Sequence, residues 1–347
     1  MDIKTAYLPF SEINQQPKSW NDSALGLISF GAPVLSNTVE ALEIPHLQLQ
    51  APVLDGADIA VEIWLSHQDL SQNKQFKSDK RGAIHYRFND ELLFGVICLP
   101  EEGSLQAATE SAYRQIFALM EALDYPHVYR FWNYMADING TNANINNHLE
   151  RYREFNVGRK DAFLAYENGI GDQLPAACAL GLADGPLTIA FLLGREAPIA
   201  IQNPRQINAF EYPDEYGPRT PSFSRATLLH TAQNSLLFIS GTASIVGHLT
   251  LHVADVVAQT NETLVNLEAV ITEANRVLGK PIFNLHDIYF RVYIRHATDL
   301  SAVQSEMQRY IGGAIKAVFI QADICRQELL LEIEATAGQI LEASNAL

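Results

Sequence analysis

The sequence predicts an α+β fold made of two copies of one unit, and three observations support this prediction. A strand pair, a helix and an aromatic strand follow one another from about residue 83, and the same order of elements returns from residue 235. Two aromatic segments, PHVYRFWNYMAD and LHDIYFRVYIRH, resemble each other letter by letter. Apolar residues recur at helical spacing between the expected strands. Each unit is therefore expected to be a mixed β-sheet with helices packed on one face, unless the likeness of the aromatic segments is a coincidence.

The expected elements of the first unit follow from residue type and period. Apolar residues at Ile116, Leu119, Met120 and Leu123 have the spacing of an amphipathic helix. Aromatic and β-branched residues favour strands. In chain order we expect a strand pair over 82–100 that turns at Asn89-Asp90, a helix over 108–123, a strand over 126–139, a partly helical segment over 146–167, and strands over 175–182 and 187–194.

The second unit is expected to repeat this order with its own strands and helices. They are a strand over 235–245, an amphipathic helix over 254–275, a strand over 286–297, a helix within 301–320 and a closing strand over 328–337. Residues 1–80 look irregular by comparison. One apolar run, Leu25 to Val34, predicts a strand that ends in the turn Gly31-Ala32-Pro33, and residues 65–82 look polar and turn-like.

Length and composition limit the organisation and the partners of the chain. Its 347 residues predict about two domains, which we place at 1–200 and 201–347. The chain has 24 Lys and Arg against 40 Asp and Glu, a formal net charge of −16. This balance argues against sequence-independent binding of nucleic acid, which needs a basic surface.

Several sequence features bear on location and on metal binding. No apolar stretch approaches the ~20 residues of a membrane span, and the N-terminal segment lacks the apolar region of a secretory signal. Cys98, Cys178 and Cys325 are odd in number and far apart, which fits neither a disulfide framework nor a cysteine-based zinc site. We therefore expect a cytoplasmic protein with reduced thiols and no membrane partner. His248 and His252 lie four residues apart without an accompanying zinc motif, so we expect no metal site there.

Arginine and tyrosine alternate along one face of the strand expected near residue 290. With a period of two, Tyr289, Arg291, Tyr293 and Arg295 share that face. Guanidiniums bind carboxylates through two hydrogen bonds, and phenols add neutral donors. The face is therefore either a site for an acidic ligand or the solvent-facing side of an edge strand.

The closing strand places two carboxyls, Glu332 and Glu334, on one face of an otherwise apolar segment. Such a carboxyl is exposed, paired with an arginine, or partly desolvated. Desolvation would raise its pKa and make it a general acid near neutral pH. The residues alone favour the exposed interpretation.

The segment over 203–226 is rich in proline, arginine and tyrosine and is either a binding loop or a linker between domains. It contains three candidate binding residues, Arg205, Tyr212 and Tyr216. The chain contains no dinucleotide-binding, phosphate-binding or hydrolase motif based on glycine.

The second half, from about Ser235 to Ala337, resembles the YjgF/Rid superfamily, which has a chorismate mutase-like fold. The segments SGTASI, ADVVAQTNETLVNLEAVI and LLLEIEA are responsible for the resemblance. It implies that both units have this fold, and that the first glutamate of E-I-E, Glu332, is functional. The arginine that small members have shortly before this strand has no match here, which argues against simple imine or enamine deamination.

Over nearly its whole length the chain is similar to the chorismatases, two-domain relatives of that superfamily. The similar segments include PHVYRFWNYMADIN, ERYREFNVGRKDAF, PAACALG, FISGTASIVGH and the loop over 203–226. This resemblance implies cleavage of the enolpyruvyl ether of chorismate, release of pyruvate, and no metal, flavin or nicotinamide cofactor. It also implies that Glu332 acts as the general acid. Candidate ligands of the two carboxylates are Arg291, Arg295, Arg205 and Arg159, with Tyr212 and Tyr216 as hydrogen-bond partners.

The resemblance also implies a choice between products. Capture of the cation by water gives a dihydroxycyclohexadiene carboxylate, whereas capture by the substrate's own hydroxyl leads to 3-hydroxybenzoate, and some relatives also form 4-hydroxybenzoate. Small residues near the ring, here Ala243 and Cys325, favour the 3-hydroxybenzoate type. A Rid-type deaminase and a non-catalytic protein that binds aromatic acids are the alternatives. The duplication permits a monomer, and the superfamily also permits a homotrimer. Secondary metabolism, as in pigment biosynthesis, is the role that the family suggests.

Overall fold

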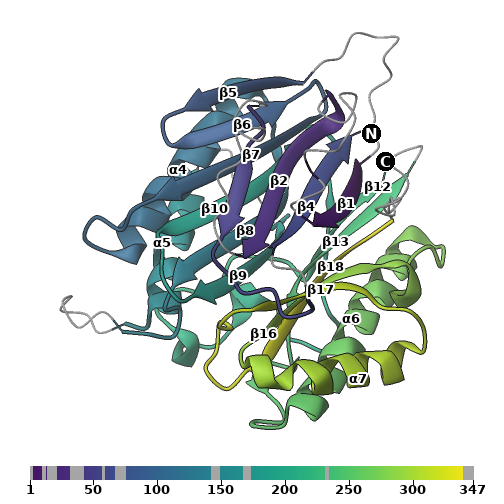
Figure 1. Cartoon of the computed structure of the whole chain (residues 1–347). Coiled ribbons are helices and arrows are strands. Elements are labelled where there is room, and N and C mark those ends of the chain that lie inside the picture. Colours follow the sequence, from purple (N-terminus) through teal and green to yellow (C-terminus); the bar gives the residue numbers. More distant parts are fainter. Residues whose placement is uncertain are drawn as a thin grey trace.

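Three large β-sheets, one two-stranded sheet and two pairs of α-helices make up most of the described part of the molecule (Figure 1). The computed structural model describes residues 3–9, 13, 22–31, 43–56, 59–66, 76–141, 149–166, 173–230 and 234–338. The smallest of the three sheets has the order β1-β4-β2-β3. Its strands are β1 (Ile3–Pro9), β2 (Ala24–Gly31), β3 (His46–Leu49) and β4 (Ile59–Ser66).

The second sheet has six strands in the order β5-β6-β7-β10-β8-β9, and two helices belong to it. The strands are β5 (Lys77–Arg81), β6 (Ile84–Phe88), β7 (Leu92–Leu99), β8 (His127–Ala136), β9 (Ala176–Leu182) and β10 (Leu187–Gly194). The helices are α4 (Leu105–Leu123) and α5 (Arg151–Ala165).

The third sheet has the order β11-β12-β13-β18-β16-β17. Its strands are β11 (Ile199–Ile201), β12 (Ala226–His230), β13 (Ser235–Thr242), β16 (Tyr289–Ile294), β17 (Lys316–Gln321) and β18 (Leu331–Ala337). Its helices are α6 (Val256–Leu278) and α7 (Leu300–Ile311), and a small hairpin joins β14 (Ile245–Val246) to β15 (Leu249–Thr250).

The two six-stranded sheets have the same topology, which confirms the predicted duplication. In each, the sixth strand along the chain lies between the third and the fourth, and a helix follows the third and the fourth. The fourth and fifth strands pair in parallel, and the sixth pairs antiparallel with both of its neighbours. The α+β class is therefore confirmed. We retain the division into residues 1–200 and 201–347 as a proposal. One sheet ends at Gly194 and the next begins at Ile199, so this boundary falls inside β11.

Each six-stranded sheet buries both of its faces. Helices α4 and α5 cover one face of the first sheet, and α6 and α7 cover one face of the other. The opposite faces pack against each other and against the four-stranded sheet. Trp64 of β4 shows this arrangement, since its ring lies 5.2 Å from that of Trp132 in β8 and 6.2 Å from that of Phe238 in β13. The main core is thus a junction of three sheets.

The expectation that residues 1–80 are irregular is wrong. They contain β1 to β4 and most of β5. The strand predicted from Leu25 is confirmed as β2. Strand β4 was missed because it is buried from Val61 to Ser66, so it lacks the alternation of polar and apolar residues by which a strand is recognised. Strand β5 was expected to be a polar turn because it is an edge strand whose side chains are mostly exposed. The expected turn beyond Gly31 lies outside the described residues.

The close crossing of α4 and α5 depends on Gly158. A Cβ atom at this position would lie 2.2 Å from the backbone oxygen of Gln106 in α4. Alanine normally stabilises a helix by about 1 kcal/mol relative to glycine, but here it would force the helices apart. We expect Gly158→Ala to lower the free energy of unfolding by about 1–3 kcal/mol, measured by urea denaturation.

Leu164→Ala, on the exposed side of the same helix, is the matched control. Leu164 is 63% exposed, so its replacement should change the free energy of unfolding by no more than about 0.5 kcal/mol. A Gly158→Ala protein as stable as the wild type would show that the helices do not approach this closely.

Candidate active site

A cavity of about 330 Å³ lies where the two units meet. Helix α5 and strand β9 of the first unit form one side of it. Strands β13 and β18, the loop before β12 and the segment before β18 form the rest. Neither unit encloses this space alone, so the cavity exists only in the assembled chain.

Hydroxyl groups join the units beside the cavity. Strand β9 is the edge strand of its sheet, and an edge leaves backbone N–H groups in need of acceptors. The N–H of Ala177 donates to Oγ of Ser240 at 2.9 Å, and the N–H of Ala176 donates to Oγ1 of Thr227 at 2.7 Å. The two hydroxyls therefore accept hydrogen bonds from N–H groups on this edge and hold β9 against β12 and β13.

A bulge in β13 makes room for the side chain of Glu332. The register between β13 and β18 shifts between Ile239 and Thr242, and Gly241 lies within the shift. A Cβ atom on Gly241 would lie 1.8 Å from Oε1 of Glu332. The carboxyl of Glu332 thus occupies the space that any larger residue at position 241 would fill.

Glu332 is buried at the cavity wall, so the exposed interpretation of this carboxyl is wrong. The residue is 4% exposed. Burial, and next the nearby Glu334, raise the pKa of Glu332 to about 8, although Arg130 and Arg225 oppose the shift. The carboxyl is therefore mostly protonated at neutral pH. The sequence could not show this, because a polar strand face looks the same whether it meets water or another sheet.

Arg159 in α5 lines the cavity with an unsatisfied guanidinium. The residue is 2% exposed, and its Nε and Nη2 have no hydrogen-bond partner among the described residues. Its guanidinium lies over the rings of Tyr113 and Phe163, 5.2 and 5.3 Å from their centroids. A buried cation in an aromatic enclosure strongly favours an anionic partner.

Three further arginines line the cavity, and sequence reasoning missed all of them. Arg153 pairs with Glu150 at 3.4 Å. Nη2 of Arg225 donates to Oη of Tyr212 at 2.8 Å, while its Nε has no partner among the described residues. Arg326 lies over the ring of Tyr216 at 4.2 Å, and its Nη1 donates to the backbone oxygen of His248 at 2.8 Å. Within the described chain, Arg159, Arg225 and Arg326 form no ion pair with a carboxylate. The cavity wall thus carries three arginines that form no ion pair among the described residues, although Glu150 and Glu328 also line it.

Six of the nine residues predicted for the site line the cavity, namely Glu332, Arg159, Tyr212, Tyr216, Ala243 and Cys325. The remaining three, Arg291, Arg295 and Arg205, lie outside its lining and already have carboxylate partners. Arg295 pairs with Asp323 at 2.5 Å and also donates to three backbone oxygens. Arg205 pairs with Glu262 at 2.6 Å. These contacts leave neither guanidinium free for a ligand.

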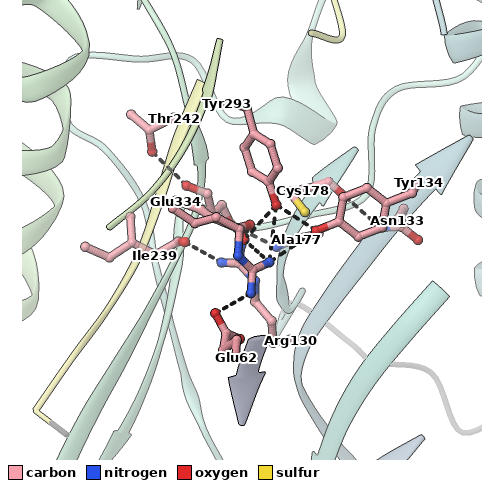
Figure 2. A network of polar contacts seen from close by, with 12 residues as sticks. Glu62, Arg130, Asn133, Tyr134, Ala177, Cys178, Ile239, Thr242, Tyr293 and Glu334 are labelled. Carbon is pink, nitrogen blue, oxygen red and sulfur yellow. Dashed lines mark hydrogen bonds and ion pairs between the residues drawn. The ribbon is translucent and has the colours of Figure 1, made fainter. Parts of the chain in front are cut away.

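Arg291 belongs to an internal cluster of charges rather than to the cavity. It pairs with Glu62 of β4 at 2.5 Å and with Glu334 of β18, and Arg130 of β8 also pairs with Glu334. Figure 2 shows Glu62, Arg130 and Glu334 gathered with Tyr293. The face of β16 that bears Arg291 therefore packs against other sheets and does not face solvent.

Two further findings on the described residues concern metal binding and membrane-spanning helices. No group of three or more His, Cys, Asp or Glu side chains in this part of the chain could hold a metal ion. His248 contacts Tyr216 and His252 contacts Glu262, so the two histidines do not converge. Among the described residues, no helix combines the length and apolar character needed to cross a membrane.

Comparisons with known proteins agree with this architecture. The family model of the N-terminal part of FkbO/Hyg5-like chorismatases matches residues 62–193. A 3-hydroxybenzoate synthase of Streptomyces hygroscopicus is 33% identical over 324 residues, which cover 89% of this chain and 90% of that protein. A chorismatase of the same organism is 33% identical over 96% of this chain and 95% of its own length.

A solved structure extends the agreement to three dimensions. The crystal structure of a chorismatase superposes with a TM-score of 0.84 at 31% identity, over 97% of this chain and 100% of that one. The fold and these relatives thus define a two-unit α+β enzyme with an arginine-lined cavity between its units. The chain belongs to the chorismatase family.

The close contact between Gly241 and Glu332 generates a prediction for a double-mutant cycle. We expect Gly241→Ala to displace the Glu332 carboxyl or the strand, and to lower the free energy of unfolding by about 1–3 kcal/mol. The same substitution should cost at least about 1 kcal/mol less in a Glu332→Ala protein, where the clash is absent. Urea denaturation of the four proteins measures both values. Equal costs in both backgrounds would contradict the contact.

Proposed function

We propose that this enzyme cleaves the enolpyruvyl ether of chorismate and releases pyruvate and 3-hydroxybenzoate. The main support is the combination of a protonated carboxyl at Glu332 with three cavity arginines that lack ion-pair partners within the described residues. Chorismate is a dianion, so its two carboxylates match such an excess of positive charge. The curated relatives named chorismatase and 3-hydroxybenzoate synthase support the same reaction.

The chemistry requires a single general acid. Glu332 donates its proton to the methylene carbon of the enol ether, which produces an oxocarbenium ion. The C4 hydroxyl of the substrate captures this ion, forms a cyclic ketal and returns a proton to the Glu332 carboxylate. Loss of the C3 ring proton then breaks the C4–O bond and makes the ring aromatic, and the hemiketal that remains collapses to pyruvate and 3-hydroxybenzoate. Chorismate and the sum of pyruvate and 3-hydroxybenzoate contain the same atoms, so this route consumes no water. The arginines bind the substrate and hold its ether beside Glu332.

The product depends on whether water reaches the cation. Ala243 and Cys325 both line the cavity, and burial raises the pKa of the Cys325 thiol to about 12. The thiol is therefore neutral and acts through its shape. We assign these residues to the wall beside the ring. If water enters instead, the product is a dihydroxycyclohexadiene carboxylate, and 4-hydroxybenzoate is a further product to assay.

Location and pathway are part of the proposal. Cys98, Cys178 and Cys325 are free thiols, which suits the reducing cytoplasm. We propose a cytoplasmic enzyme that supplies an aromatic acid to secondary metabolism, such as pigment formation.

Incubation of the purified protein with chorismate, without added metal or cofactor, tests the proposal. A lactate dehydrogenase assay detects pyruvate, and chromatography separates the ring products. We expect pyruvate and 3-hydroxybenzoate in equal amounts. Pyruvate with the diene diol would change the product assignment, and absence of pyruvate would overturn the reaction in favour of a binding protein or a Rid-type deaminase.

Replacement of Glu332 tests the role of the acid. We expect Glu332→Gln to lower kcat about 100-fold or more while ligand affinity changes little, because the amide keeps the shape but donates no comparable proton. In the wild type, the acid is active only while protonated, so kcat/KM should be constant below a pH of about 8 and fall above it. Steady-state kinetics across pH measure both effects. A variant with wild-type turnover would exclude Glu332 as the acid.

Replacement of Arg159 tests the binding of a carboxylate. Arg159→Met retains an apolar side chain among the aromatic rings but removes the cation. We expect the Kd for 3-hydroxybenzoate to rise about tenfold or more, measured by calorimetry. Arg114→Met in α4, where the side chain is 51% exposed, should leave the Kd unchanged. Equal affinity of all three proteins would place the carboxylate elsewhere.

A further inference from the structure

We propose that Glu334, held as an anion by Arg130 and Arg291, is a positioning residue that keeps Glu332 protonated. The proposal rests on the function proposed above, since it concerns the acid of that reaction. Glu334 lines only a small gap between the sheets and not the large cavity, so its effect on the reaction must be transmitted through Glu332.

The two carboxyls are close neighbours on one strand. Glu332 and Glu334 share a face of β18, where such residues are about 7 Å apart. They are 4% and 3% exposed, so little solvent screens their interaction. On the neighbouring strand β16, Tyr293 is opposite Glu332 and Arg291 is opposite Glu334. The arginine is therefore aligned with the second carboxyl and not with the first.

The charge cluster around Glu334 is already balanced. Two carboxylates, Glu62 and Glu334, face two guanidiniums, Arg130 and Arg291. Oη of Tyr293 also donates to Glu334 at 3.1 Å. Although burial alone would raise it, Arg291 and Arg130 hold the pKa of Glu334 below its usual value. The cluster has no spare positive charge, so ionisation of Glu332 would place an unpaired anion beside an existing one.

The other groups that face Glu332 do not offset this repulsion. Tyr152 of α5, Cys178 of β9 and Cys325 each have a pKa raised by burial, so they stay neutral. Arg225 is the remaining cation, and its Nη2 donates to Tyr212 Oη and to the backbone oxygen of Ile207. Glu332 therefore keeps its proton, and the negative charge of Glu334 is one of the reasons.

Two variants with opposite expected effects test the proposal. Glu334→Gln removes the anion and frees Arg130, so the pH at which kcat/KM falls should decrease by about 1–2 units. Arg130→Gln removes a cation that lowers the pKa of Glu332 directly and also neutralises Glu334, so the pH at which kcat/KM falls should increase. Glu334→Gln is therefore the variant that isolates the role of Glu334. A structural defect alone would lower the activity of both variants, but it would not move the pH at which kcat/KM falls down in one variant and up in the other.

Glu62→Gln is the matched control. It breaks a buried ion pair of the same cluster by the same chemical change. Among the described residues the ion pair of Glu62 is with Arg291 and not with Arg130. We expect the pH at which kcat/KM falls to shift by less than half as much in Glu62→Gln as in Glu334→Gln. Equal shifts, or no shift in a folded Glu334→Gln protein, would overturn the proposal.

Infrared spectroscopy provides a readout that does not require turnover. The protonated carboxyl band that Glu332→Gln abolishes belongs to Glu332, and its titration gives the pKa directly. We expect this titration to move down in Glu334→Gln and up in Arg130→Gln. If the wild type forms no pyruvate but the band moves as stated, the proposed reaction is wrong, and the proposed effect of Glu334 on the pKa of Glu332 is supported. If pyruvate forms and the band does not move, the role of Glu334 is wrong.

Discussion

A buried chain of alternating charges joins the three sheets, and the geometry of the site depends on it. Glu62 comes from the four-stranded sheet, Arg291 and Glu334 come from the second unit, and Arg130 comes from the first. Buried ion pairs contribute little net stability compared with apolar contacts, but breaking one is costly. All four groups are paired in the observed arrangement, and a shift of one sheet would separate at least one of these ion pairs. The chain of charges therefore specifies how the sheets dock, while the apolar core between them supplies most of the stability.

Duplication explains why the cavity has one acid and not two. Tyr134 in β8 and Tyr293 in β16 hold equivalent positions in their units, and their hydroxyls share a hydrogen bond at 2.6 Å. Opposite Tyr293 lies Glu332, whereas opposite Tyr134 lies Thr188. The first unit thus lacks the carboxyl and instead contributes Arg159 to the cavity. One copy supplies the acid and the other supplies a cation, so the site requires both.

The sequence predicts the regular parts of this fold well, because helices and half-buried strands have clear periods. It fails for β4, which is buried on both faces from Val61 to Ser66, and for the role of Arg291, whose partner Glu62 is 229 residues away. An arginine on a strand looks the same in sequence whether it binds a ligand or forms an ion pair with a carboxylate of the same chain. Glu332 could be named through the family resemblance. Arg225 and Arg326 lie in irregular segments, where no periodic pattern marks the side that faces the cavity.

The charge of the proposed substrate favours the protonation state that its cleavage requires. In the free enzyme, Arg225 lowers the pKa of Glu332 and so partly opposes the effects of burial and of Glu334. A bound dianion would neutralise the cavity arginines and bring further negative charge near the carboxyl, while water is displaced. Each of these changes disfavours ionisation of Glu332. The proposed acid would therefore hold its proton most firmly when the enol ether lies beside it, whereas without substrate Arg225 favours loss of this proton. Binding and proton donation are in this way coupled through charge, without any movement of the fold.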